Sequence, residues 1–395
     1  MSPCPTITLK PGKEQSMLRF HPWVFSGAIK KMSEKPAEGQ LVDVVSNEGL
    51  FLGKGHYQPS SISVRILSFQ QEEIDLSFWK RRISNAWQVR KACGLTDSPA
   101  TNVFRLIHGE GDDLPGLIAD FYNGLLVTQM HSAGMYLERG LLAQAFREIL
   151  GDRLLAIYDK SEGALPYHAP VKAVNGFIFG SGGEFIAKEY DKLFSIDYSL
   201  GQKTGFFIDQ RENRRLLQEM ARDREVLNMF CYTGGFSVYA LAGGAKLVHS
   251  VDSSKQAIDL TRKNVLLNFG EENRHEAFAT DAFDFLRQAD QKYDLIILDP
   301  PAFAKHTDAL KNALQGYKKL NARAIEAVRP GGIIFTFSCS QVVNRDAFRK
   351  AVFSGAAVAG RSVRILHQLS QPEDHPVNIY HPEGEYLKGL VLYVE

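Results

Sequence analysis

After residue 200 the chain alternates short apolar runs with longer segments of helical period. The apolar runs are EVLNMF, KLVHSVD, EAFAT, YDLIIL and, further on, GGIIFTFSCS. The segments between the first four are FSVYALAGG, SKQAIDLTRKNVLLN and AFDFLRQ. Strands that alternate with helices predict a parallel sheet covered on both faces, with its ligand beyond the carboxyl ends of the strands. We therefore predict an α/β domain in this part of the chain.

The first 200 residues have a different pattern. From Ile7 to about Phe69 there are short alternating or apolar runs broken by Gly, Pro and Asn, which predict a small β-rich domain without a long helix. Residues 104–194 mix strand-like runs such as GLLVTQM with the helical YLERGLLAQAFREIL, which predicts an α+β domain. We place the three domains at residues 1–73, 74–195 and 196–395.

An amphipathic helix is predicted between the first two of these regions, from Ile74 to about Cys93. Phe78, Ile83 and Trp87 lie near one face of it. Its basic residues fall mostly outside that face: Lys80, Arg81, Arg82, Arg90 and Lys91.

Composition sets limits on the class of protein. The chain has 395 residues, 44% of them hydrophobic and 23% charged, which indicates several globular domains and excludes a disordered, collagen-like or coiled-coil protein. It has no apolar run of membrane length and no signal-peptide pattern, so we expect a cytoplasmic protein without a membrane partner. The net charge of +1 argues against an indiscriminate polyanion binder.

The four cysteines, Cys4, Cys93, Cys231 and Cys339, lie far apart in the sequence. They have neither a paired spacing nor the spacing of metal ligands with histidine. We therefore expect no disulfide framework and no bound metal.

A glycine turn is the first feature that indicates a ligand. In NMFCYTGGFSVYALAGGA, residues 228–245, a strand leads through Gly234 and Gly235 into a helix of small residues. Such a turn lets backbone N–H groups approach a ligand at the positive end of the helix, which favours a nucleotide-like cofactor over a turn without a ligand. The sequence G-x-G-x-x-G is absent, which disfavours NAD.

Three carboxylates follow successive strands of the predicted sheet. Asp252 can accept hydrogen bonds from ribose hydroxyls, although it can equally cap the helix that follows. Asp281 can contact an adenine amino group, with helix capping as an equal alternative. Asp299, in LDPPAF, precedes two prolines that fix an extended turn and aim the carboxylate into the crevice.

Together these segments resemble class I S-adenosylmethionine-dependent methyltransferases. More narrowly, the chain is similar to the family of 23S ribosomal RNA cytosine-5 methyltransferases, which join a PUA domain to a middle domain and a Rossmann-like catalytic domain. The resemblance includes RFHPWVFSGAI, GLFLGKGHYQPSSISVRIL, LIHGEGDDLPGLIADFYNGLLVTQ and GQKTGFFIDQRENR. It implies S-adenosylmethionine as cofactor, with these residues at its site: Thr204, Asp209, Phe230, Tyr232, Gly234, Gly235, Asp252, Ser253, Asp281 and Asp299.

The resemblance also gives Cys339, in FTFSCSQ, a catalytic role. C5 of a pyrimidine is a poor nucleophile, and addition of a thiolate at C6 activates it. Asp299 would then protonate or hydrogen-bond cytosine N3 as negative charge develops there. A base must finally remove the C5 proton, and the sequence leaves four candidates open: Asp374, His375, Glu383 and Glu385. The alternative for Cys339 is an inert core thiol, the role we give to Cys4, Cys93 and Cys231.

The implied partner is 23S ribosomal RNA, since PUA domains read structured RNA mainly by shape. Trp23 is a candidate for stacking on RNA, with core packing as the alternative. Lys80, Arg81 and Arg82 are candidates for phosphate contacts, with a solvated helix face as the alternative. A homodimer through the middle domain is a working hypothesis.

Other functions remain open at this point. Methylation of uracil C5 is the nearest alternative, and methylation of a guanine nitrogen is disfavoured because a nitrogen nucleophile needs no thiolate. A catalytically silent RNA-binding assembly factor is the alternative from another class. The presence of Asp252, Asp299 and Cys339 together argues against it.

Overall fold

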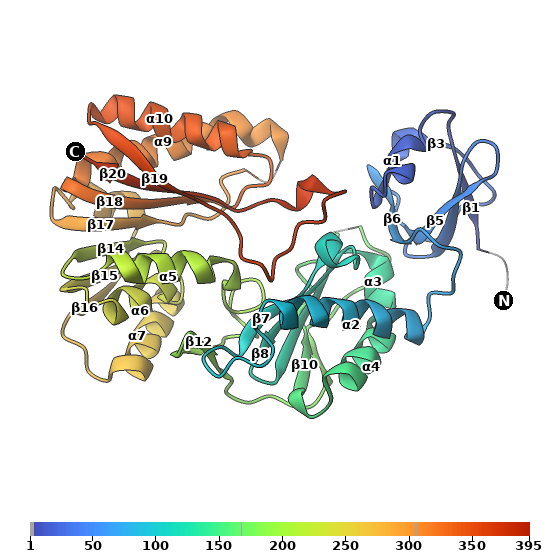
Figure 1. Cartoon of the computed structure of the whole chain (residues 1–395), viewed down its shortest axis with the longest axis horizontal. Helices are drawn as coiled ribbons and strands as arrows, with labels where there is room; N and C mark the ends of the chain where they lie inside the picture. Colours follow the sequence, from blue (N-terminus) through green and yellow to red (C-terminus); the bar gives the residue numbers. More distant parts are fainter. Residues whose placement is uncertain (1–3, 167, 305) are drawn as a thin grey trace. The chain divides into compact units, whose positions relative to one another are not determined.

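The computed structural model describes residues 4–166, 168–304 and 306–395, which form two compact units (Figure 1). The first unit contains the chain up to Lys188 together with Ile196–Ile208 and Glu373–Gly384. The second contains Glu189–Ser195, Asp209–Pro372 and Glu385–Glu395. The domain boundaries that we placed after residues 73 and 195 stay a prediction.

The first unit begins with a six-stranded sheet in the order β2-β6-β5-β4-β1-β3. Alternate residues of β4, such as Val42 and Val44, are fully buried against Ile7 and Val64, as a strand with one face on a core requires. The only α-helix described here is the four-residue α1, so the prediction of a small β-rich region is confirmed. Its elements are β1 Thr6–Leu9, α1 Gln15–Leu18, β2 Trp23–Phe25, β3 Ile29–Met32, β4 Leu41–Val45, β5 Phe51–Tyr57 and β6 Ile62–Ser68.

A five-stranded sheet in the order β11-β10-β9-β8-β7 follows, packed with helices α2 and α4. Asp75 caps α2 by accepting a hydrogen bond from the backbone N–H of Phe78 at 2.9 Å. The α+β prediction is confirmed. The elements are α2 Leu76–Ala92, β7 Val103–His108, β8 Leu117–Tyr122, β9 Leu125–Met130, α3 Ala133–Leu137, α4 Arg139–Leu150, β10 Ala156–Asp159 and β11 Gly176–Phe179. The short strands β12 Ile186–Glu189 and β13 Lys192–Ser195 come next along the chain.

The second unit is built on a seven-stranded sheet in the order β16-β15-β14-β17-β18-β20-β19. Its strands are β14 Glu225–Met229, β15 Leu247–Asp252, β16 His275–Ala279, β17 Tyr293–Leu298, β18 Val328–Ser338, β19 Val363–Leu369 and β20 Lys388–Val394. The strands from β14 to β18 are parallel, as predicted, but β20 is antiparallel to both its neighbours. The prediction of parallel strands is therefore confirmed for the five runs on which it was based, while β19 and β20 were not predicted.

Two groups of helices cover this sheet, with α9 and α10 lying together on one side of it (Figure 1). Leu227, Ile296 and Ile334, from three neighbouring strands, are fully buried beneath them. The helices are α5 Arg211–Met220, α6 Gly235–Ala242, α7 Lys255–Phe269, α8 Ala282–Arg287, α9 Leu310–Ala327 and α10 Arg345–Ala359. In the part of the chain that is described, no helix combines the length and the apolar character needed to cross a membrane.

Candidate active site

The glycine turn lies between β14 and α6. Phe230 and Tyr232 have positive φ angles of 57° and 47°, and Gly234 has a φ of 76°. Non-glycine residues rarely adopt this conformation, and such strain is typical of functional loops. A Cβ atom at Gly234 would lie 2.6 Å from Thr261 Cγ2, so only glycine fits there. The backbone of residues 230–235 is thus held close to the carboxyl end of β14, directly before the N-terminus of α6.

Asp252 ends the neighbouring strand β15 and holds this turn. Its Oδ2 accepts a hydrogen bond from the N–H of Tyr232 at 3.0 Å, and its Oδ1 accepts one from the N–H of Ser254 at 2.9 Å. Ser254, not Asp252, caps α7 by accepting from Ala257 N–H at 3.3 Å. The capping alternative for Asp252 is therefore wrong, and each carboxylate oxygen keeps a lone pair at the edge of the turn. Ser253 is exposed beside it.

Asp281 lies at the same edge of the sheet, but unlike Asp252 it caps the helix that follows it. It caps α8, since its Oδ1 accepts a hydrogen bond from Asp284 N–H at 3.0 Å. The capping alternative for this residue is thus observed, and the exposed carboxylate keeps its second oxygen.

Asp299 follows β17 and has an unusual protonation state. Its pKa is raised to about 7, first by burial and then by the nearby charge of Asp209, against the lowering effects of a hydrogen bond with Gln210 and the charge of Arg214. A substantial fraction of the Asp299 carboxyl is therefore protonated at neutral pH and can donate a hydrogen bond.

Asp209 precedes α5 and is held from the other end of the chain. Tyr386 donates a hydrogen bond from its hydroxyl to Asp209 Oδ2 at 2.7 Å. The second oxygen, Oδ1, is buried without a hydrogen-bond partner among the described residues. Such a buried carboxylate oxygen can accept a hydrogen bond from a ligand.

Cys339 comes directly after β18, the strand next to β17. Its side chain is partly exposed, whereas Ser338 and Ser340 on either side are buried. Ser338 donates a hydrogen bond to the hydroxyl of Tyr317 at 2.9 Å. The pKa of Tyr317 is raised to about 12, mainly by burial, and the charges of Cys339 and Asp299 both contribute. Cys339 and Asp299 thus lie within electrostatic range of one buried tyrosine.

Thr204 belongs to the first unit and has its contacts there. Its hydroxyl donates to Asp120 Oδ2 at 2.6 Å and bonds the hydroxyl of Tyr122 at 2.9 Å, all within the first unit. Asp120 also accepts two hydrogen bonds from the Arg105 guanidinium, at 2.8 and 2.9 Å. The Thr204 side chain is fully buried in this network, and its place in the cofactor site stays a prediction.

The residues predicted to bind RNA all have partners within the protein. Trp23 donates from Nε1 to Glu110 Oε1 at 2.8 Å, and its ring centroid lies 4.3 Å from that of His381. The three cations of α2 each pair with a carboxylate: Lys80 with Glu148 at 2.6 Å, Arg81 with Glu72 at 2.5 Å and Arg82 with Asp113 at 3.2 Å. These pairs are what a solvated helix face would show, and the RNA contacts stay a prediction.

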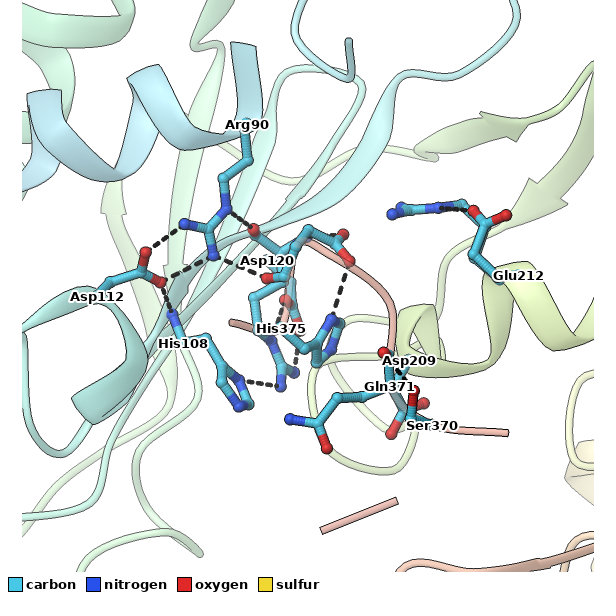
Figure 2. A network of polar contacts seen from close by, with 12 residues as sticks. Arg90, His108, Asp112, Asp120, Asp209, Glu212, Ser370, Gln371 and His375 are labelled. Carbon is cyan, nitrogen blue, oxygen red and sulfur yellow. Dashed lines mark hydrogen bonds and ion pairs between the residues drawn. The ribbon is translucent and has the colours of Figure 1, made fainter. Parts of the chain in front are cut away.

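The prediction that Arg90 belongs to the basic, solvent-facing side of α2 is wrong, because this side chain is fully buried. Figure 2 shows its contacts. It forms a bidentate ion pair with Asp112, and it donates to the backbone oxygens of Arg105 and Asp374, each at 2.7 Å. Asp112 also accepts from the N–H of His108 at 2.6 Å. The sequence pattern could not show this, because Asp112, which pairs with Arg90, and the carbonyls of Arg105 and Asp374 lie outside the helix.

The candidates for the C5 base differ in their surroundings. Asp374 and His375 are buried in the network of Figure 2, where Asp374 Oδ2 accepts from Arg105 N–H at 2.9 Å and Oδ1 lies 3.0 Å from His375 Nδ1. Glu383 and Glu385 are about half exposed, and Glu385 pairs with Arg345 at 2.5 Å. These contacts give Asp374 and His375 a structural role in the first unit.

Lys388 is a residue that the sequence analysis missed. It opens β20 directly opposite Ser338, and only 3% of its surface is exposed. The signal was present in the apolar run GLVLYV, which reads as a strand beginning just after this lysine.

Two family models match the chain. Residues 104–379 match the family described as S-adenosylmethionine-dependent methyltransferase, and residues 7–69 match a PUA-like domain. The cofactor of this protein is therefore S-adenosylmethionine.

Curated relatives narrow the assignment. A protein of Tolumonas auensis, named Ribosomal RNA large subunit methyltransferase I, is 40% identical over 98% of each chain. A protein of the same name from Enterobacter sp. (strain 638) is 38% identical over 98% of this chain and 99% of its own. The chain belongs to this family of S-adenosylmethionine-dependent methyltransferases. A putative methyltransferase from Streptococcus mutans, 24% identical, shares the fold over 98% of this chain and all of its own, with a TM-score of 0.84.

Proposed function

We propose that this protein transfers a methyl group from S-adenosylmethionine to C5 of a cytosine in 23S ribosomal RNA, with Cys339 as covalent nucleophile. The observation that carries the proposal is the placement of Cys339 and Asp299 after neighbouring parallel strands, both within electrostatic range of Tyr317. The name of the relatives supports ribosomal RNA of the large subunit as substrate. The PUA-like domain supports recognition of structured RNA.

The cofactor supplies an electrophilic methyl group, and the residues at the turn fit it. The lone pairs of Asp252 would accept hydrogen bonds from ribose hydroxyls, while the backbone of Gly234 and Gly235 lies at the N-terminus of α6. The unpartnered Oδ1 of Asp209 would accept a hydrogen bond from the cofactor's ammonium group. Phe230 and Tyr232 frame the turn, and Ser253 and Asp281 line the same edge.

The chemistry then follows from two side chains. The thiolate of Cys339 adds to C6, the electron pair of the C5–C6 double bond forms a C4–C5 double bond, and the pair of the C4–N3 double bond moves to N3, which takes the proton of Asp299. The cofactor, held by the turn, would supply its methyl group to the activated C5 and would leave as S-adenosylhomocysteine. A base removes the C5 proton, the double bond re-forms, and Cys339 leaves as thiolate as N3 returns its proton to Asp299.

The protonation state of Asp299 favours cytosine over uracil. N3 of cytosine is a hydrogen-bond acceptor, whereas N3 of uracil carries a proton. A carboxyl with a pKa of about 7 offers the donor that cytosine requires. Methylation of a guanine nitrogen would not require the thiol of Cys339. A catalytically silent assembly factor would require neither this thiol nor the protonated carboxyl of Asp299.

The decisive experiment combines a variant with a trapping substrate. Cys339→Ala should abolish methyl transfer while S-adenosylmethionine binding, measured by calorimetry, stays within about twofold. 23S RNA transcribed in vitro with 5-fluorocytidine in place of cytidine should form a covalent adduct with the wild type only. Fluorine at C5 takes the place of the hydrogen that the base must remove, so the adduct cannot be released. Turnover by Cys339→Ala, or an adduct with it, would overturn the proposal.

Nucleoside mass spectrometry of ribosomal RNA gives the test in the cell. A strain that lacks the gene should lose 5-methylcytidine at one position of its 23S RNA. Loss of a methylguanosine or a methyluridine instead would support an alternative. We further propose that the enzyme acts in the cytoplasm, where ribosomal RNA is available to it.

A further inference from the structure

A buried cation lies beside the proposed nucleophile. In the register of β18 and β20, Lys388 is paired with Ser338, the residue directly before Cys339. The Nζ atom of Lys388 donates a hydrogen bond of 2.6 Å to the backbone oxygen of Ser340, the residue directly after Cys339. The ammonium group is therefore fixed against the short segment that carries the thiol.

The second contact of Lys388 is to the segment directly before its own strand. Nζ donates to the backbone oxygen of Tyr386, also at 2.6 Å. Both acceptors are neutral carbonyls, and an ammonium group has three hydrogen atoms to donate. The contacts to Ser340 and Tyr386 leave the third available.

Lys388 has no carboxylate counter-ion in the described chain. No acidic oxygen of residues 4–166, 168–304 or 306–395 lies within 4.0 Å of Nζ, and the nearby Glu385 is itself paired with Arg345. Burial of an ammonium group without an anionic partner costs folding free energy, so a buried lysine usually lies close to an anion. The anion that the neighbouring residue can provide is the thiolate of Cys339.

We propose that Lys388 is a positioning residue that stabilises the thiolate of Cys339 and so sets the pH range in which this nucleophile is active. The proposal rests on the proposed function of Cys339. Burial lowers the pKa of Lys388 to about 8, and the charge of Cys339 opposes that lowering, so the ammonium form predominates at neutral pH. A positive charge close to a thiol lowers the thiol pKa and raises the fraction of thiolate.

The test measures the thiol itself and does not depend on turnover. The rate at which iodoacetamide alkylates Cys339, followed by mass spectrometry of the peptide that contains it, is measured from pH 5.5 to 9.5. The wild type should titrate with a midpoint below the ordinary thiol value of about 8.5. Lys388→Met should raise this midpoint by about one pH unit or more and slow alkylation at pH 7 about tenfold, since the thiolate fraction falls tenfold per unit.

Two further variants separate charge from structure. Lys388→Arg keeps the cation and should stay within about threefold of the wild type, because a guanidinium remains protonated at these pH values. Lys350→Met is the matched control: it removes one positive charge from a side chain that is 75% exposed on α10, and should change nothing. Binding of S-adenosylmethionine by all three variants verifies that they are folded.

Each outcome decides the question. A wild-type midpoint at or above about 8.5 overturns the proposal even if Lys388→Met does not fold. Equal slowing by Lys388→Met and Lys388→Arg also overturns it, since a merely structural lysine would give that result. If Cys339→Ala kept its methyltransferase activity, the proposed function would fail, while the alkylation profile would still report on Lys388.

Discussion

The proposed active site has two parts, a cofactor half and a reaction half, and their residues are held in place by different interactions. In the cofactor half, the turn of residues 230–235 is fixed by positive φ angles and by backbone groups bonded to Asp252. In the reaction half, Asp299 and Cys339 depend on buried side chains, including Tyr317 and Lys388. The first half is specified by backbone shape, and the second by charge and burial.

This difference separates binding from chemistry. In the proposed site, the backbone turn and the hydrogen-bonded carboxylate of Asp252 recognise the cofactor by shape and by hydrogen bonds. The reaction half requires that Asp299 is protonated and that Cys339 is deprotonated. Variants in the two halves should therefore change different kinetic constants, and three substitutions test this in order of decreasing effect.

The largest effect is expected in the reaction half, from Asp299→Asn. The amide cannot give a proton to N3, so we expect kcat to fall about 100- to 10,000-fold while the Kd for S-adenosylmethionine changes little. In the wild type, kcat should decline as pH rises above about 7, because Asp299 loses its proton there. This decline should disappear in the variant. An equal loss in cofactor binding would break the separation between the two halves.

The stability of the same variant gives an independent check. A carboxyl whose pKa is raised on folding binds more protons in the folded state, so stability falls as pH rises from the unfolded value of about 3.9 to about 7. Relative to the wild type, Asp299→Asn should therefore be more stable at pH 8 than at pH 4. Thermal unfolding at the two pH values measures it.

An intermediate effect is expected in the cofactor half, from Asp252→Ala. Loss of the carboxylate removes the acceptor for ribose, the hydrogen bond that holds the turn at Tyr232 and the one to Ser254, so the Kd for S-adenosylmethionine should rise about tenfold or more. With saturating cofactor, kcat should recover most of its value. Ser254→Ala is the control, since it removes the cap of α7 but not the carboxylate. Unchanged binding in Asp252→Ala would contradict the ribose assignment.

The smallest effect is expected from Cys231→Ala. Burial raises the pKa of this thiol to about 12, and its neighbours Ile258 and Ala277 form a small apolar cluster. We expect less than about a twofold change in kcat and in the Kd for the cofactor, and no alkylation of Cys231 at pH 7 in the wild type. Rapid alkylation of Cys231 would contradict the prediction that this thiol is unreactive whereas that of Cys339 is reactive.

Pattern and motif predicted most of the architecture. The parallel strands from β14 to β18 follow directly from alternating runs, and the positions after them led to Asp252, Asp299 and Cys339. The antiparallel β20 could not be predicted this way, because its position depends on pairing with β18, some 50 residues earlier in the sequence. Lys388 was missed for the same reason.

Helix periodicity failed where charge was buried. Arg90 has the spacing of a solvent-facing residue on α2, yet it lies in the core because Asp112 and the backbone of Asp374 surround it. Asp252 and Asp281 show a second limit. Both precede helices, and only the contacts show that Asp281 caps its helix while Asp252 holds the turn.

The path of the chain has a consequence for its synthesis. Residues 373–384 belong to the first unit, although the residues before and after them belong to the second. Arg90 can therefore donate its hydrogen bond to the carbonyl of Asp374 only after almost the entire protein has left the ribosome. The N-terminal half can begin to fold while translation continues, and Asp112 can already pair with Arg90 there. The last hydrogen bond of this buried arginine forms only after residue 374 emerges, which links the maturation of the first unit to the completion of the polypeptide.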